Sequence, residues 1–163
     1  MASKQIEKAM EGIVVLVADS NPYMRRLTRM MLTNLGVKSI YEAGDGIATI
    51  DAIRTVNPDV MILEWELPVL DGREVMRIVR SPGVFPKPNL PVIMLTDRGL
   101  RSRVTTAIRL GVHEFLVKPI SPKTLQQRLL GIMLKPRPMV RAGRYYIPMP
   151  RRRVDLKEFI YAV

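Results

Sequence analysis

The sequence predicts an α/β domain built on a doubly wound, five-stranded parallel sheet, followed by an arginine-rich C-terminal extension. Apolar runs alternate five times with amphipathic segments, and this alternation is typical of a parallel sheet with helices on both faces. The runs are continuous rather than alternating, as expected of strands buried on both sides. The regular pattern stops near residue 135. We therefore divide the chain into an N-terminal lead (1–12), an α/β domain (13–134) and a tail (135–163).

Each strand is expected where an apolar run lies between turn or helix-stop signals. The five expected strands are 13–17, 39–43, 60–63, 91–95 and 114–117. Each helix is expected where apolar residues recur at helical spacing. The clearest start is Asn21 followed by Pro22, a capping residue and a favoured first helical residue. The five expected helices are 22–35, 47–56, 73–80, 102–110 and 121–133.

Composition excludes several kinds of site. The chain has 163 residues, no cysteine and one histidine, so it has no disulfide and no thiolate metal site. A histidine-based zinc site or a Ser-His-Asp triad would depend on His113 alone, for which we expect a surface or packing role. The N-terminus lacks the apolar core of a signal peptide, and no apolar run is long enough to span a bilayer. We therefore expect a cytoplasmic protein.

Polar residues gather where the predicted strands end. Asp19 and Ser20 follow the first strand, Glu64 the third, Thr96 the fourth and Lys118 the fifth. The carboxyl ends of parallel strands share one edge of the sheet, and ligands of such sheets bind there. The sequence therefore predicts one functional crevice at this edge.

Four segments in order carry a family resemblance: VLVADSNPYMRR, PDVMILEWELPVLDG, PVIMLTD and FLVKP. Over residues 13–133 the chain resembles the receiver domains of bacterial response regulators, of which CheY is the single-domain form. The resemblance implies that Asp19 is the first of two metal-binding acids, Thr96 the switch residue and Lys118 the phosphate-pairing lysine. It also places Phe115 where the family often has a rotating aromatic residue.

Two positions depart from that family's chemistry. Ser20 stands where the second metal-binding acid is expected, which removes one negative charge from a site that must hold Mg²⁺. Glu64 stands where the phosphoacceptor Asp is expected, and its extra methylene displaces the carboxylate from the in-line position. We predict a degenerate site that binds no metal well, accepts no phosphoryl group and performs no catalysis.

Glu64 has two interpretations. In the first, it reaches Lys118 and holds an active-like state without phosphate. In the second, which we favour, it forms an ion pair with Lys118 in a retired site, because one carboxylate imitates a phosphoryl group poorly. A regulator that accepts phosphate on Glu64 is a further alternative. Trp65 beside it is expected at the sheet edge, either exposed for stacking or packed in the core.

The tail holds over half of the chain's excess positive charge. Residues 135–163 contain eight basic and two acidic residues, which gives +6 of a formal net charge of +11. Prolines at 136, 138, 148 and 150 oppose a helix, and we expect an extended, polyproline-like strap. Leu156, Phe159 and Ile160 suggest that residues 154–163 dock as a short helix.

Arginine rather than lysine dominates this basic segment, and two tyrosines lie within it. The guanidinium fork matches phosphate oxygens and the O6/N7 edge of guanine, and tyrosines offer stacking surfaces. Arg137 and Arg141 have the RxxxR spacing of PilZ-type cyclic di-GMP sites. The candidate ligand-binding residues are Arg137, Arg141, Arg144, Tyr145, Tyr146, Arg151, Arg152 and Arg153.

A degenerate receiver with an arginine-rich tail resembles the Cle group of CheY-like cyclic di-GMP effectors. The resemblance implies that the ligand is cyclic di-GMP. It also implies a protein partner, such as the flagellar motor, that contacts the face from Ser102 to Met133. One alternative is an adaptor whose basic tail docks on an acidic protein without nucleotide. Another, which we do not favour, is nonspecific binding of nucleic acid, with steep salt dependence.

Overall fold

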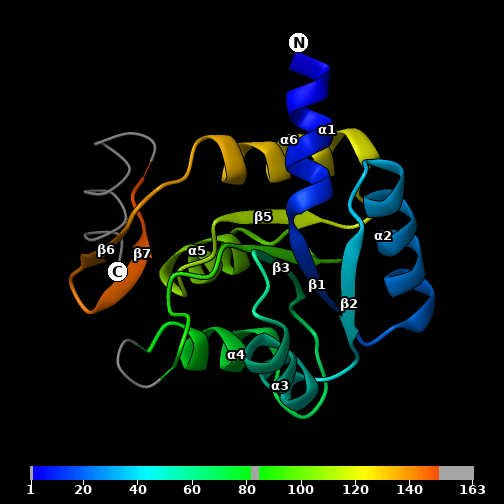
Figure 1. Ribbon diagram of the computed structural model, residues 1–163. Helices are drawn as coiled ribbons and strands as arrows, with labels where there is room; N and C mark the ends of the chain where they lie inside the picture. Colours follow the sequence, from blue (N-terminus) through cyan, green and yellow to red (C-terminus); the bar gives the residue numbers. More distant parts are fainter. Residues whose placement is uncertain (1, 82–84, 151–163) are drawn as a thin grey trace.

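The predicted parallel sheet is confirmed by a computed structural model, which describes residues 2–81 and 85–150 (Figure 1). The strands lie in the order β2-β1-β3-β4-β5, and every neighbouring pair is parallel. Chain order reverses between β1 and β3, as in doubly wound folds whose sites lie at that switch point. The strand bounds are β1 (Val14–Ala18), β2 (Ser39–Ala43), β3 (Val60–Glu64), β4 (Val92–Thr96) and β5 (Glu114–Val117).

The five predicted helices are all present, and a sixth precedes them. Asn21 accepts hydrogen bonds from the backbone N–H groups of Tyr23 and Met24, which confirms the capped start of the helix at Pro22. The helix bounds are α1 (Ala2–Gly12), α2 (Pro22–Asn34), α3 (Gly46–Val56), α4 (Gly72–Val79), α5 (Arg101–Arg109) and α6 (Pro122–Leu134).

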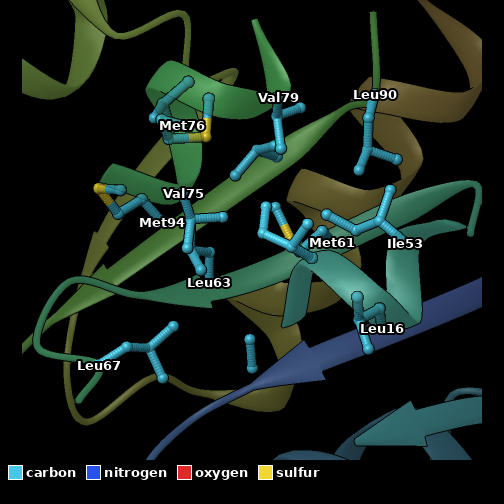
Figure 2. Packing of buried hydrophobic residues seen from close by; sticks show 14 of the residues in the cluster. Leu16, Ile53, Met61, Leu63, Leu67, Val75, Met76, Val79, Leu90 and Met94 are labelled. Atoms are coloured by element: carbon cyan, nitrogen blue, oxygen red, sulfur yellow. The ribbon is translucent and has the colours of Figure 1, made fainter. Parts of the chain in front are cut away.

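The sheet separates two apolar cores, because successive side chains of each strand point to opposite faces. From β1, Val15 and Val17 join the core beneath α2 and α6, whereas Leu16 packs in the core beneath α3 and α4. Figure 2 shows the second core, where Leu16 lies near Met61 and Ile53. Burial on both faces explains why the strand sequences are continuously apolar.

The N-terminal lead forms α1, an element that the sequence analysis did not predict. Met10 is fully buried and Ile6 packs against the same core, with a spacing of four residues that places them on one helix face. In the described part of the chain, no helix is long and apolar enough to cross a membrane.

The start of the tail is a β-hairpin, so the expected polyproline-like strap is wrong for residues 139–148. Strands β6 (Met139–Ala142) and β7 (Tyr145–Pro148) pair antiparallel across the two-residue turn Gly143-Arg144. Gly143 has φ +60°, as a hairpin turn with glycine in its first position requires. The prolines stand at the hairpin ends, where a missing N–H costs no ladder bond. The short helix expected at 154–163 lies outside the described residues.

The hairpin packs beside α5 and the turn that follows it (Figure 1). Gly111, in this turn, has φ +86°, and a Cβ there would lie 2.5 Å from the carbonyl oxygen of Tyr146. The hairpin backbone therefore lies so close to the α/β domain at this point that only a glycine fits there. The Tyr146 hydroxyl also donates to Asn89 Oδ1, at 2.5 Å.

Candidate functional site

Three of the predicted site residues meet at the carboxyl edge of the sheet. Lys118 Nζ lies 2.9 Å from Asp19 Oδ2 and 3.2 Å from Glu64 Oε1, so one ammonium group bridges two carboxylates. Asp19 is almost fully buried, and the side chains of Glu64 and Lys118 are each 12% exposed. The topology brings these residues together from the ends of β1, β3 and β5.

Ser20 completes this network by binding the other oxygen of Glu64. Its backbone N–H and its hydroxyl both donate to Glu64 Oε2, each at 2.8 Å. The longer side chain of glutamate therefore spans from β3 to the end of β1, where the serine replaces an expected acid. Both carboxylate oxygens of Glu64 are engaged within the protein.

The charges at this edge hold Lys118 protonated. Burial alone lowers the pKa of Lys118, but hydrogen bonding and Coulombic attraction from Asp19, and then from Glu64, outweigh burial and raise it above its ordinary value. Lys118 therefore remains a cation throughout the physiological pH range. The three groups carry one net negative charge.

The residues present do not fit the divalent cation of the receiver family. Mg²⁺ requires oxygen ligands in near-octahedral geometry, with carboxylates to balance its charge. Here Ser20 supplies no charge, and Lys118 occupies an oxygen of each of the two acids. Within residues 2–81 and 85–150, no group of three His, Cys, Asp or Glu residues is arranged to hold a metal ion.

Thr96, the predicted switch residue, faces α5 rather than Glu64. Its hydroxyl accepts hydrogen bonds from Arg103 Nη1 at 2.9 Å and from the backbone N–H of Arg98 at 3.1 Å. Arg103 also donates to Glu66 Oε1, at 2.7 Å. Sequence analysis did not identify Arg103, which lies within a predicted helix with no motif around it.

Trp65 is packed, which decides between its two expected positions. It is 6% exposed, and the Arg103 guanidinium lies 4.9 Å from the centre of its ring. Phe115 meets the indole edge-on, with ring centres 6.4 Å apart. The tryptophan therefore links the end of β3 to α5 and β5 rather than presenting a stacking surface to solvent.

A second site lies where the hairpin meets the receiver helices. A cavity of about 590 Å³ lies between β6–β7 and the C-terminal ends of α4 and α5. Four of the predicted ligand-binding residues line it, and so do three arginines that the sequence analysis missed. The predicted ones are Arg141, Arg144, Tyr145 and Tyr146, and the additional ones are Arg77, Arg80 and Arg109.

The structure does not bring the two arginines of the RxxxR pattern together. Arg137 lines a different cavity and donates to the backbone oxygens of His113, at 2.7 Å, and Met149, at 3.3 Å. Arg141 lies on β6 and lines the hairpin cavity. The remaining predicted residues, 151–153, lie outside the described part of the chain.

His113 has a packing role at the base of the hairpin. Its Nδ1 accepts a hydrogen bond from the backbone N–H of Val92, at 3.3 Å. Burial, together with repulsion from Arg80 and then Arg137, lowers the pKa of His113 to about 3. The imidazole is therefore neutral at physiological pH.

Comparison with known proteins identifies the class to which this fold and this edge belong. Residues 15–130 match the response regulator receiver domain family. The chain is 27% identical to the receiver domain of the Pseudomonas aeruginosa sensor histidine kinase PA1611, solved with magnesium in its active-site cleft (TM-score 0.65, covering 73% of this chain and 95% of that one). It is 26% identical to Vibrio cholerae CheY4 (TM-score 0.64, covering 72% and 95%). The chain belongs to the response regulator receiver family.

Within that family, the relatives of this chain include CheY proteins. A CheY homologue of Campylobacter jejuni is 34% identical over 121 residues, which cover 73% of this chain and 91% of the relative. CheY1 of Helicobacter pylori is 32% identical over 116 residues, which cover 71% and 92%. The family match, over residues 15–130, includes neither α1 nor the hairpin. The protein is a CheY-like receiver, a class of signalling proteins.

Proposed function

We propose that this protein is a phosphorylation-independent CheY-like signalling protein that binds cyclic di-GMP through its C-terminal hairpin and then engages a protein partner. The observation that carries the proposal is the hairpin cavity, which collects Arg141, Arg144, Tyr145 and Tyr146 around about 590 Å³. Guanidinium groups match phosphate oxygens and the Hoogsteen edge of guanine, and tyrosine rings stack on bases.

The receiver edge supports an input other than phosphate. A phosphoacceptor needs a free carboxylate and a bound Mg²⁺, whereas Glu64 already accepts hydrogen bonds from Ser20 and Lys118. The ion pair is common to both interpretations of Glu64. Thr96 is bonded to α5 instead of to Glu64, which favours the retired site over an active-like one.

An exposed apolar stripe supports a protein partner at the face formed by residues 102–133. Leu100, Val104 and Ile108 recur every four residues along α5 and its cap, and Leu100 and Ile108 are 54% and 42% exposed. Val117, at the end of β5, is 44% exposed. Several relatives are named as chemotaxis proteins, and we propose a flagellar motor component as the partner.

Calorimetric titration of the full chain with cyclic di-GMP, GTP and cyclic di-AMP tests the nucleotide proposal. We expect binding that is selective for cyclic di-GMP. Arg141→Lys with Arg144→Lys keeps the charge but removes the planar forks, and we expect at least about a tenfold loss of affinity. Arg26→Lys, an exposed change on α2, is the matched control and should bind like wild type.

Two results would contradict the nucleotide proposal in different ways. Equal binding of the three nucleotides, falling steeply with salt, would indicate nonspecific attraction to polyanions. Absence of binding would leave the alternative, in which the basic tail docks on an acidic protein without nucleotide. Motor binding that survives the Arg→Lys changes and needs no cyclic di-GMP would support that alternative.

A further inference from the structure

The hairpin cavity has two walls, and only one belongs to the tail. Arg141, Arg144 and Tyr145 come from the hairpin. The opposite wall comes from the receiver domain, with Arg77 in the last turn of α4 and Arg109 in the last turn of α5. Arg77 precedes Arg141 by 64 positions in the chain and Arg109 precedes it by 32, yet all three line one cavity.

The cavity carries a marked excess of positive charge. Five arginines and no acidic residue are among the residues that line it. Like charges gathered around one space raise its potential and favour an anion there. The tail alone places only Arg141 and Arg144 at this cavity, whereas the receiver domain adds three more guanidinium groups.

Arg80 adds a buried charge behind this surface. It is 7% exposed, and its guanidinium donates to the carbonyl oxygens of Gly111, Leu90 and Pro88 rather than to a carboxylate. Burial lowers the pKa of Arg80 to about 10, and Coulombic attraction from Tyr146 partly opposes this. The group remains a cation at neutral pH, with its hydrogen bonds satisfied and its charge unbalanced by any of these partners.

Arg77 and Arg109 are less buried than Arg80. Arg77 is exposed, and Arg109 is partly buried with its guanidinium 6.0 Å from the Tyr145 ring centre. The Arg144 guanidinium, from the hairpin, lies 5.3 Å from the centre of the same ring. Tyr145 is therefore contacted by one arginine from each wall of the cavity.

An ordinary explanation exists for basic residues in these positions. Arg77 and Arg109 both stand in last helical turns, where a cation interacts favourably with the helix dipole. That interaction would not require both side chains to line one cavity with the hairpin. The two explanations also predict different effects of substitution, because loss of a ligand contact lowers the affinity whereas loss of a helix-dipole interaction lowers the stability of the helix.

We infer that Arg77 and Arg109 form a receiver-side half of the ligand site, so that a bound cyclic dinucleotide joins the hairpin to α4 and α5. This inference rests on the proposed function, which concerns the hairpin residues. The phosphates are held between guanidinium groups of both walls. Ligand binding thereby acts on α5, the helix that also bears the apolar stripe and Arg103.

The test uses the full chain with Arg77→Gln and Arg109→Gln, each titrated with cyclic di-GMP by calorimetry. Arg101→Gln is the matched control, because it removes the same charge from the other end of α5. We expect each cavity variant to lose about tenfold in affinity, as for a charge-assisted hydrogen bond, and the control to change less than about twofold. Arg109→Lys guards against misfolding, because it keeps the charge and should bind between wild type and Arg109→Gln.

A second readout follows the guanidinium groups directly. In NMR spectra of the labelled chain, the side-chain N–H signals of Arg77 and Arg109 should shift as cyclic di-GMP is added, and that of Arg101 should not. If wild type binds, hairpin variants lose binding, and the Arg77 and Arg109 variants bind normally with unshifted signals, this inference is wrong and the proposed function stands. If wild type does not bind, both fail together.

Discussion

The contact between Gly111 and the hairpin gives a prediction about stability that depends on the tertiary structure alone. Gly111→Ala places a methyl group 2.5 Å from the carbonyl oxygen of Tyr146 and 2.9 Å from Nε of Arg80. Relieving such overpacking costs about 1–3 kcal/mol. The left-handed backbone adds about 1–2 kcal/mol for a non-glycine residue, offset by about 0.4–1 kcal/mol from the stiffer unfolded chain. The expected loss of unfolding free energy is therefore about 1–4.6 kcal/mol.

Gly143 offers a matched control for the backbone cost. It too has positive φ, at +60°, but a Cβ there would meet no atom within 4 Å. Gly143→Ala should therefore cost at most about 1.6 kcal/mol, the backbone part alone. Urea unfolding followed by circular dichroism measures both losses.

Amide hydrogen exchange shows which part of the structure each substitution destabilises. We expect Gly111→Ala to speed exchange throughout β6 and β7, because the hairpin must move away from α5. Equal losses of stability in the two variants, or unchanged exchange of the hairpin after Gly111→Ala, would refute the close approach of β7 to the receiver domain.

Three further predictions concern the receiver edge and the buried imidazole. With acetyl phosphate and Mg²⁺, mass spectrometry should detect no phosphorylation of wild type but should detect it after Ser20→Asp with Glu64→Asp; modification of wild type would contradict the degenerate site. Lys118→Met leaves Asp19 and Glu64 facing each other without their cation, so urea unfolding should show a loss of about 2–4 kcal/mol, and a loss near zero would mean that solvent screens the pair. The pKa of His113 is about 3 in the folded protein and 6.5 in the unfolded chain. The stability that comes from keeping this imidazole neutral is therefore fully present above pH 6.5 and is lost as pH falls toward 3, with about 2 kcal/mol of unfolding free energy lost by about pH 5. His113→Asn should reduce this pH dependence of stability, and an unchanged slope would show that carboxylates alone produce it.

The receiver fold was predictable because its information is local. Continuous apolar runs identified the strands, and Asn21 with Pro22 identified a helix start to the residue. The gathering of Asp19, Glu64 and Lys118 followed from the rule that parallel strands end at one edge. The identities of Ser20 and Glu64 by themselves argued against metal binding and phosphorylation.

The hairpin shows where local reasoning failed. Four prolines favoured an extended strap, although Gly143-Arg144 between residues of high strand propensity was a usable signal for a two-residue turn. The strand pairing also depends on a surface to pack against, and Gly111 supplies that surface from a turn far away in the chain. Helix α1 was missed for a related reason, because Ile6 and Met10 only become a buried face beside the core.

Residue type and short-range spacing were sufficient to predict the parallel sheet, the loss of the second acid and the arginine-rich character of the tail. The folded structure was needed to show that Ser20 and Lys118 engage both oxygens of Glu64, and that Arg137 and Arg141 line different cavities. It alone placed Arg77 and Arg109 opposite the hairpin. Contacts between residues distant in the chain depend on how helices end and pack around the sheet, and no local pattern records that geometry.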